Sequence, residues 1–399
     1  MRKRISVIVA TSVALAFSGA AAAHNAASTI GAVVARNSLP TPQAIAPASV
    51  PLTASGGPLI FSDAPEQFNV SAAPGAFYRA NATGSFRVFW HHQNVSDIPA
   101  EVALVLTNTT AAPEAVFSSG LGIAQSFYPD QAGQTALSQF FDSQTGIHLL
   151  AKLSPQQSYW LTEPADMTSY NGKLYGNTVS GMAQFSIVTL PALGAAARDC
   201  CPSMPNPASP LQGLPAGKVT VTNLAYHGSA PSDPLAVPIL ANPGNTVRGT
   251  FPTFRRSGAV NIDLAQGPQS LAIESAVSGP YSRALPGEYQ VGSDVVDGTQ
   301  VYDNGNYGVT YRLDFRFTHP GTYKSVTIYD VPAGGAGHYA VWTHHHVLDS
   351  PYLTYEDAWA VAAQNIGPGT SIRLKTALPG GSDGPQLFII EPSTSPVTP

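Results

Sequence analysis

Short runs of β-branched and aromatic residues recur through most of this chain, and Gly, Pro, Asn and Asp separate them. The runs lie at residues 86–90, 102–107, 159–161, 184–190, 219–223, 270–275, 311–317, 325–329, 339–343, 371–376 and 387–390. Residues of the first kind favour strands, whereas those between the runs favour turns. The 36 Gly and 35 Pro residues also fit many turns better than long helices. The pattern therefore predicts a mainly β protein made of antiparallel sandwiches.

Two segments have helical spacing instead. The first is an apolar stripe that follows Pro129 and Asp130, and it consists of Ala136, Leu137, Phe140 and Phe141. In the second, Thr354 and Asp357 have the spacing of a capping box ahead of an apolar side formed by Ala358, Trp359, Val361 and Ala362. Each segment follows a strand pair and precedes a further strand. We therefore expect two tandem immunoglobulin-like sandwich domains, each with about one short helix.

The N-terminal sequence has the order of a secretory signal. Arg2, Lys3 and Arg4 precede an apolar run that ends in a run of alanines at residues 20–23. We expect a signal peptide over residues 1–23, with retention as an anchor left open, and a secreted or cell-surface location. The composition further predicts a disordered Ala/Ser/Pro-rich lead over residues 24–58, domains at 59–192 and 217–391, a Pro-rich linker or long loop at 193–216, and a disordered tail at 392–399.

Charged residues make up only 11% of the chain, against about 25% in a typical soluble protein. Without the signal, 16 basic and 24 acidic residues remain, a net charge of −8. This balance argues against nucleic acid or an anionic membrane as a partner. No later apolar run approaches the roughly 18 residues that a membrane span needs, so no span is expected after signal cleavage.

Some phrases are similar to those of a known group. Residues 86–94, with the sequence FRVFWHHQN, resemble a first-domain strand of uncharacterised secreted proteins of Gram-positive bacteria. The phrases VRGTF at residues 247–251 and NYGVTY at residues 306–311 resemble the entry and core strand of their second domain. The resemblance implies a tandem β-sandwich architecture in a bacterial extracellular setting, and it implies no activity.

Histidines suggest one candidate metal site. His344 and His346 follow an apolar strand and, if the strand continues, point to one face, with His338 just before it. Two imidazoles in that geometry suit a transition metal. The alternative is a polar hairpin tip. His91 and His92 are adjacent and so face opposite sides of a strand, which predicts one buried and one exposed ring.

Asp294, Asp297 and Asp303 gather oxygen donors of the kind that calcium prefers. The alternative is a hairpin turn, because Asp-Asn-Gly favours a positive φ without any ion. Transition metal and calcium are therefore the only cofactors that the sequence suggests.

Residues 380–384, GGSDG, match the G-x-S-x-G pattern of a hydrolase nucleophile. That chemistry needs a strand-to-helix turn and a histidine later in the chain, whereas this motif lies between two predicted strands with no later histidine. We interpret the motif as a glycine-rich hairpin.

Cys200 and Cys201 are the two cysteines of the chain, and adjacent thiols cannot link distant strands. A vicinal disulfide closes a strained ring, so intermolecular bridging or free thiols are equally open.

No catalytic motif emerges, and we expect a non-catalytic structural or adhesive protein of unknown ligand. Its partner would be an envelope, matrix or carbohydrate component, and a homo-oligomer is left open. The alternative is a metal-dependent or carbohydrate-active secreted protein with a loop site near His344. Exposed aromatic side chains would favour sugar binding, whereas the apolar contexts of Trp342 and Trp359 predict that both belong to the core.

Overall fold

The computed structural model describes residues 29–397 except 42–45, 49, 163–176, 191–210, 212, 245, 275–284, 286–287 and 344–345. The described chain is mainly β, as predicted, and its strands form four sheets. None of the helices in this part of the chain has the length and apolar character needed to cross a bilayer.

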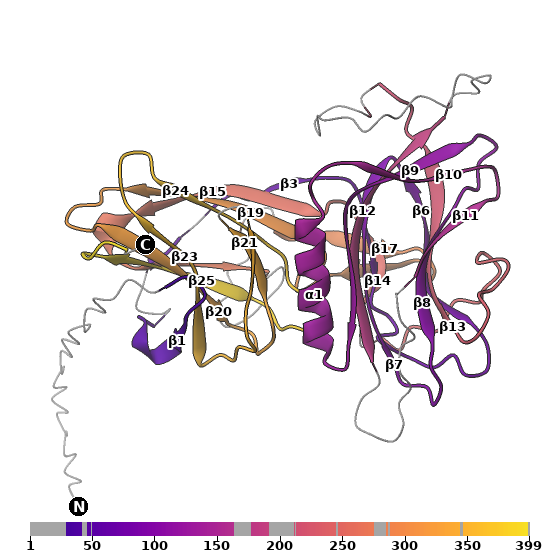
Figure 1. The fold of residues 1–399 in the computed structure, drawn as a ribbon, viewed down its shortest axis with the longest axis horizontal. Helices are drawn as coiled ribbons and strands as arrows, with labels where there is room; N and C mark the ends of the chain where they lie inside the picture. Colours follow the sequence, from indigo (N-terminus) through magenta and orange to yellow (C-terminus); the bar gives the residue numbers. More distant parts are fainter. Residues whose placement is uncertain are drawn as a thin grey trace, which may run out of the picture.

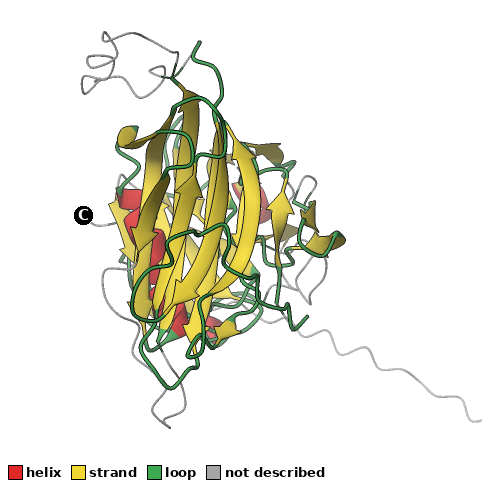
Figure 2. Cartoon of the chain, turned by 90° about the vertical axis from the view of Figure 1, so that its right-hand side faces the viewer, coloured by secondary structure: helices red, strands yellow, loops and turns green. Residues whose placement is uncertain are grey.

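Two of the sheets form the half of the molecule on the right of Figure 1. The nine-stranded sheet has the order β10 (His148–Leu153), β9 (Glu114–Ser126), β12 (Thr178–Thr189), β7 (Ser85–Asn94), β4 (Leu59–Ser62), β14 (Arg248–Phe251), β17 (Val291–Asp294) and β18 (Thr299–Tyr302), with β5 (Gln67–Phe68) paired to β7. The four-stranded sheet has the order β11 (Ser158–Thr162), β8 (Glu101–Thr107), β13 (Lys218–Tyr226) and β6 (Gly75–Thr83). Figure 2 looks onto this end of the molecule, where long strands fill the view.

Two six-stranded sheets form the other half. The β20 sheet has the order β1 (Val33–Ala35), β23 (Asp357–Asn365), β20 (Ser325–Pro332), β25 (Gln386–Ser393), β16 (Gln269–Ile273) and β2 (Ala46–Pro47). The β19 sheet has the order β22 (His346–Asp349), β21 (Ala340–Thr343), β24 (Ser371–Thr376), β19 (Thr310–Thr318), β15 (Arg255–Asp263) and β3 (Thr53–Ser55). Short 3-10 helices η1 (Arg36–Ser38) and η4 (Leu264–Gln266) flank strands of this half.

Each pair of sheets encloses an apolar core. The first core contains Phe77 of the four-stranded sheet and Trp90 of the nine-stranded sheet. The second contains Phe388 of the β20 sheet and Phe315 of the β19 sheet, whose ring centroids lie 6.3 Å apart. Burying a side chain of this size contributes about 1.5–3 kcal/mol of stability.

Helix α1 (Pro129–Asp142) lies between the two halves (Figure 1). Its buried side chains Leu137 and Phe140 belong to the second core, together with Phe89 of the nine-stranded sheet. The predicted first helix is therefore confirmed, and its apolar stripe joins the two halves.

The predicted second helix is wrong, because these residues form β23. The capping-box residues Thr354 and Asp357 do hydrogen-bond, with Thr354 Oγ1 donating to Asp357 Oδ2 at 2.9 Å, but they close a turn. β23 is paired on both sides, with β1 and β20, and residues 358–362 are all buried. A strand buried on both faces has a continuous apolar run that resembles a short helix in the sequence.

The sheets are also mixed rather than antiparallel. β15 pairs in parallel with β19, and β4 and β5 each pair in parallel with β7. β2 also pairs in parallel with β16. The expectation of antiparallel sandwiches is wrong for these pairs, since strand direction depends on connections that local residue patterns do not encode.

Chain order and sheet membership also differ from the predicted domain boundaries. Strands in 33–55, where the composition predicted a disordered lead, pair with β23, β16 and β15. Within the predicted second domain, β13, β14, β17 and β18 join the sheets of the first half, whereas β15 and β16 belong to those of the second. The strands in residues 33–55 are short and lie at the edges of their sheets, where each pairs with one longer strand. Their own composition therefore gave little strand signal.

Candidate functional site

A cleft of about 600 Å³ opens at the N-terminal end of α1. Four segments converge on it: the start of α1, the β20–β21 connection, the segment after β22, and the β24–β25 connection. Its lining consists of Tyr128, Pro129, Asp130, Gln131, Ala336, His338, Tyr352, Gly381 and Asp383. We call it the Asp130–His338 cleft.

A histidine–carboxylate pair forms the polar centre of this cleft. His338 Nδ1 lies 2.8 Å from Asp130 Oδ2, and each side chain is only 13% exposed. A carboxylate oxygen can only accept, so Nδ1 carries the proton of this bond. In the neutral ring, Nε2 is then an acceptor, and it has no hydrogen-bond partner within the described chain.

The position of Asp130 follows from the start of α1. Pro129 occupies the first turn, where its missing N–H is not needed. Asp130 is the acidic residue of that turn, close to the positive end of the helix dipole. The first turn of the helix therefore directs the Asp130 side chain to His338.

Glycines let the β24–β25 connection lie against this turn. A Cβ at Gly133 would lie 2.0 Å from the Gly380 carbonyl oxygen, and a Cβ at Gly381 would lie 2.6 Å from the Pro129 carbonyl carbon. Gly381 also has φ +76°, which side chains disfavour. The glycines of the G-x-S-x-G match thus serve close backbone packing.

Ser382 of the same motif is not a nucleophile in this geometry. It is 1% exposed, and its Oγ donates to the His338 backbone oxygen at 2.7 Å. The motif lies between two strands, as predicted, but β24 and β25 belong to different sheets. The segment is therefore a connection between sheets, and the predicted hairpin is wrong.

Two exposed tyrosines rim the cleft. Tyr128 is 58% exposed and Tyr352 is 57% exposed. The Tyr352 ring lies 5.5 Å from the His338 ring, and Phe127, itself 42% exposed, meets Tyr128 edge to face at 5.6 Å. Adjacent exposed rings beside a polar centre are typical of a binding surface.

Behind the β24–β25 connection, both His91 and His92 are buried, so the expectation of one exposed ring is wrong. His92 Nε2 lies 2.8 Å from Asn223 Oδ1, and its ring stacks on Phe77. Neither ring nitrogen of His91 has a partner within the described chain. Burial lowers the pKa of His91 to about 4 and that of His92 to about 3, so both are neutral at pH 7.

Of the predicted histidine metal ligands, the two in the described part of the chain, His338 and His346, lie apart from each other. β21 and β22 form the hairpin of the alternative interpretation, in which His346 pairs with Thr343. His338 precedes the other end of that hairpin and belongs to the Asp130–His338 cleft. His344 lies outside the described residues, as do Cys200 and Cys201.

The predicted calcium ligands have other partners. Arg248 Nε lies 2.9 Å from Asp294 Oδ2, and its Nη2 lies 3.2 Å from Asp297 Oδ2. Asp303 lies beyond the opposite end of the β17–β18 hairpin and accepts from the Tyr307 backbone N–H at 3.0 Å. Within the described ranges, no group of three or more His, Cys, Asp or Glu side chains is placed to hold a metal ion.

Sequence reasoning selected His338 but missed Asp130, Asp383 and the two tyrosines. Asp130 was identified only as part of a helix start. Its partner lies 208 residues away, and no local pattern encodes such a contact. For Tyr352 there was one usable signal, the PYLTY sequence of residues 351–355, in which two tyrosines fall outside any predicted strand.

No protein-family model matches this chain, and no curated protein matches it significantly. The resemblance to secreted Gram-positive proteins therefore stays a prediction.

Proposed function

We propose that this chain is a secreted or cell-surface structural or adhesive protein that binds a saccharide in the Asp130–His338 cleft. The observation that carries the proposal is the placement of two exposed tyrosine rings, Tyr128 and Tyr352, beside a largely buried histidine–carboxylate pair. The proposal includes two sandwich domains, supported by the two pairs of sheets. Their immunoglobulin-like form and the secretory signal stay predictions.

The chemistry of the cleft suits a ring with many hydroxyl groups. Tyrosine faces offer apolar surface to the C–H side of a sugar ring, and their hydroxyls stay available as hydrogen-bond partners. Asp383 and Asp130 can accept from sugar hydroxyls, and His338 Nε2 can accept another. A volume of about 600 Å³ lies in the range of small-molecule sites.

A second candidate function is acid–base catalysis on a carbohydrate, which corresponds to the alternative predicted from the sequence. The observation that favours it is the 2.8 Å hydrogen bond that His338 donates to Asp130, because a carboxylate that orients imidazole is common in general-base sites. Ser382 is engaged with a backbone oxygen, so His338 would have to activate water.

Binding of an oligosaccharide library to the full chain tests the proposal. Tyr128→Ala and Tyr352→Ala should each weaken binding of a positive saccharide about tenfold, a loss of roughly 1.4 kcal/mol. Tyr302→Ala, an exposed tyrosine on β18, is the matched control and should leave binding unchanged. Equal losses in all three variants, or no bound saccharide, contradict the proposal. Release of reducing ends that stops in His338→Gln would favour the catalytic candidate.

A further inference from the structure

The outer side of the β19 sheet carries a cluster of cations. Along β19 the side chains alternate, so Leu313 and Phe315 enter the core while Arg312 and Arg316 face outward. On the neighbouring β24, Arg373 is outward in the same way. This patch contrasts with the net charge of −5 for the whole chain. The overall charge balance used in the sequence analysis does not reveal this patch, because strand alternation concentrates a few arginines on one side.

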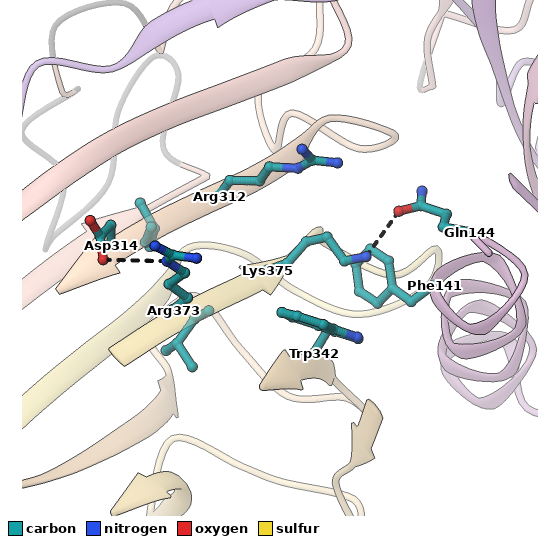
Figure 3. A pocket seen from close by; sticks show the side chains of 9 residues that line it. Phe141, Gln144, Arg312, Asp314, Trp342, Arg373 and Lys375 are labelled. Atoms are coloured by element: carbon teal, nitrogen blue, oxygen red, sulfur yellow. Dashed lines mark hydrogen bonds and ion pairs between the residues drawn. The ribbon is translucent and has the colours of Figure 1, made fainter. Parts of the chain in front are cut away.

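These cations border a pocket of about 400 Å³ near the C-terminal end of α1. Figure 3 shows Arg312, Arg373 and Lys375 extending from two adjacent strands, with Trp342 and Phe141 beside Lys375. The full lining is Phe141, Gln144, Arg312, Leu313, Asp314, Trp342, Arg373, Leu374 and Lys375. We call it the Arg312–Trp342 pocket.

Negative charge is scarce in this pocket. Asp314 is the one carboxylate among the described lining residues. Its Oδ2 lies 2.7 Å from Arg316 Nη2, outside the pocket lining, and its Oδ1 lies 3.9 Å from Arg373 Nε. The Arg312 guanidinium has no hydrogen-bond or ion-pair partner within the described chain. The three cations of the pocket, Arg312, Arg373 and Lys375, are therefore accompanied by a single carboxylate, and that carboxylate already pairs with Arg316.

Lys375 is fixed in place at the inner side of the pocket. Its Nζ donates to Gln144 Oε1 at 2.9 Å and lies 4.5 Å from the Phe141 ring centroid and 5.1 Å from that of Trp342. Burial, followed by the charge of Arg312, lowers the pKa of Lys375 to about 8. A bound anion would relieve this crowding of positive charge.

Trp342 was expected in the core, but it is only partly buried and lines the pocket. A partly exposed indole gives a flat apolar surface in the pocket that two guanidinium groups also line. Guanidinium forks match a planar carboxylate in geometry and charge. The combination suits a ligand that carries a carboxylate on a ring with an apolar face.

We propose that the Arg312–Trp342 pocket binds an acidic saccharide, with the carboxylate of a uronic acid residue held by Arg312 and Arg373 and its ring packed on Trp342. This pocket shares no lining residue with the Asp130–His338 cleft. The two sites are near opposite ends of α1, roughly 16 Å apart along its axis. The inference therefore does not depend on the proposed function.

A polysaccharide fits these observations better than a membrane surface. The exposed large apolar side chains of the described chain include none from β15, β19, β21 or β24. The patch therefore offers nothing to insert among lipid chains. Single-stranded nucleic acid would need several stacking rings along a groove, whereas the exposed aromatic surface here is that of Trp342.

Calorimetry on the full chain with trigalacturonic acid tests this inference, with neutral galactotriose as the matched ligand. We expect trigalacturonic acid alone to bind, and Arg312→Gln and Arg373→Gln each to weaken it about tenfold or more. Lys152→Gln is the control, since it removes an exposed cation on β10, outside the pocket and away from its lining residues. Tyr352→Ala in the Asp130–His338 cleft should leave trigalacturonic acid binding unchanged, so the two binding proposals are tested independently.

Other outcomes overturn the proposal. These are equal binding of the acidic and neutral trisaccharides, absence of trigalacturonic acid binding, and equal losses in Lys152→Gln and Arg312→Gln. Tighter binding to phosphatidylglycerol vesicles or to an oligothymidylate than to trigalacturonic acid would assign the patch to a lipid or a nucleic acid instead. Circular dichroism of each variant confirms that it is folded, as expected for changes at exposed side chains.

Discussion

His338 donates through Nδ1 to Asp130 Oδ2 at 2.8 Å, although 208 residues separate the two in the sequence. Asp130 belongs to the first turn of α1, and His338 belongs to the connection that precedes β21. The contact therefore joins the helix between the two halves to the β19 sheet. It also leaves Nε2 of His338 as the acceptor within the cleft.

Asp130→Asn tests that relationship. The amide keeps the shape of the side chain but removes the charge that orients the imidazole. We expect saccharide binding in the cleft to fall about tenfold and the free energy of unfolding to fall by about 1.5–3 kcal/mol, as for a hydrogen bond to a charged group. Titration calorimetry and urea unfolding measure the two effects. Asp142→Asn, at the other end of α1, is the control and should change neither.

Arg87 should be essential for joining the two halves. It is 1% exposed, and its Nη1 donates to Phe254 O at 3.0 Å, Gly308 O at 2.8 Å and Thr310 Oγ1 at 2.6 Å. Its guanidinium also lies 4.4 Å from the Phe254 ring centroid. Arg87→Met would leave Gly308 O and Thr310 Oγ1 without this donor, whereas Phe254 O still accepts from the Thr310 N–H at 3.0 Å. We therefore expect a loss of about 3 kcal/mol in urea unfolding.

The control for this prediction is Arg316→Met, which removes a guanidinium that is 58% exposed and should change stability by less than about 0.5 kcal/mol. A single unfolding transition is expected in the unmodified chain, because the second core and Arg87 both span the halves. Two separate transitions, or equal stability of the two variants, would show that the halves fold independently.

The fold was predictable from the sequence wherever a local pattern determines local structure. The alternating runs predicted the strands, and Pro129 with the stripe at Leu137 and Phe140 predicted α1. β23 was misassigned as a helix because Trp359 and Val361 are buried together with the residues between them. The short edge strands in residues 33–55 gave little signal, because each depends on pairing with a longer neighbouring strand.

The sites were much less predictable, because each combines residues from distant segments. Trp342 is apolar in its local context, and only the approach of α1 with Phe141 and Gln144 makes it part of a pocket. The arginines of β19 and β24 looked unremarkable in a chain with an acidic balance. Their clustering depends on the register that places Arg312 opposite Lys375 and Asp314 opposite Arg373.

Buried carboxyl groups should make the protein less stable as the pH rises toward 8. Burial raises the pKa of Asp303 and that of Asp330 to about 8, from 3.8 in the unfolded chain. Between these values the folded state binds more protons, so unfolding becomes easier with increasing pH by about 1.4 kcal/mol per pH unit for each group. This contribution is complete below pH 3.8 and is lost as the pH passes through about 8.

The buried histidines act in the opposite direction at lower pH. The pKa values of His91 and His92, about 4 and about 3, lie below the unfolded value of 6.5, so stability falls as the pH decreases below 6.5. The two histidines oppose the effect of Asp303 and Asp330 between about pH 4 and 6.5, whereas these two carboxyl groups act without that opposition from pH 6.5 to 8. Asp330→Asn should therefore flatten the decrease in melting temperature over that upper window. An unchanged slope in a series of melting curves would contradict this assignment.

Gly133→Ala should destabilise the protein, although alanine normally stabilises a helix interior by about 0.5–1 kcal/mol. The added Cβ would lie 2.0 Å from the Gly380 carbonyl oxygen, so the β24–β25 connection must move away from α1. We expect a loss of about 1–3 kcal/mol in urea unfolding, as for overpacking, together with weaker saccharide binding because Gly381 and Asp383 line the cleft. Gly146→Ala, whose new Cβ would lie 3.8 Å from its nearest neighbour, is the matched control and should be neutral. A Gly133→Ala protein as stable as the unmodified chain would mean that the connection does not pack on the first turns of α1.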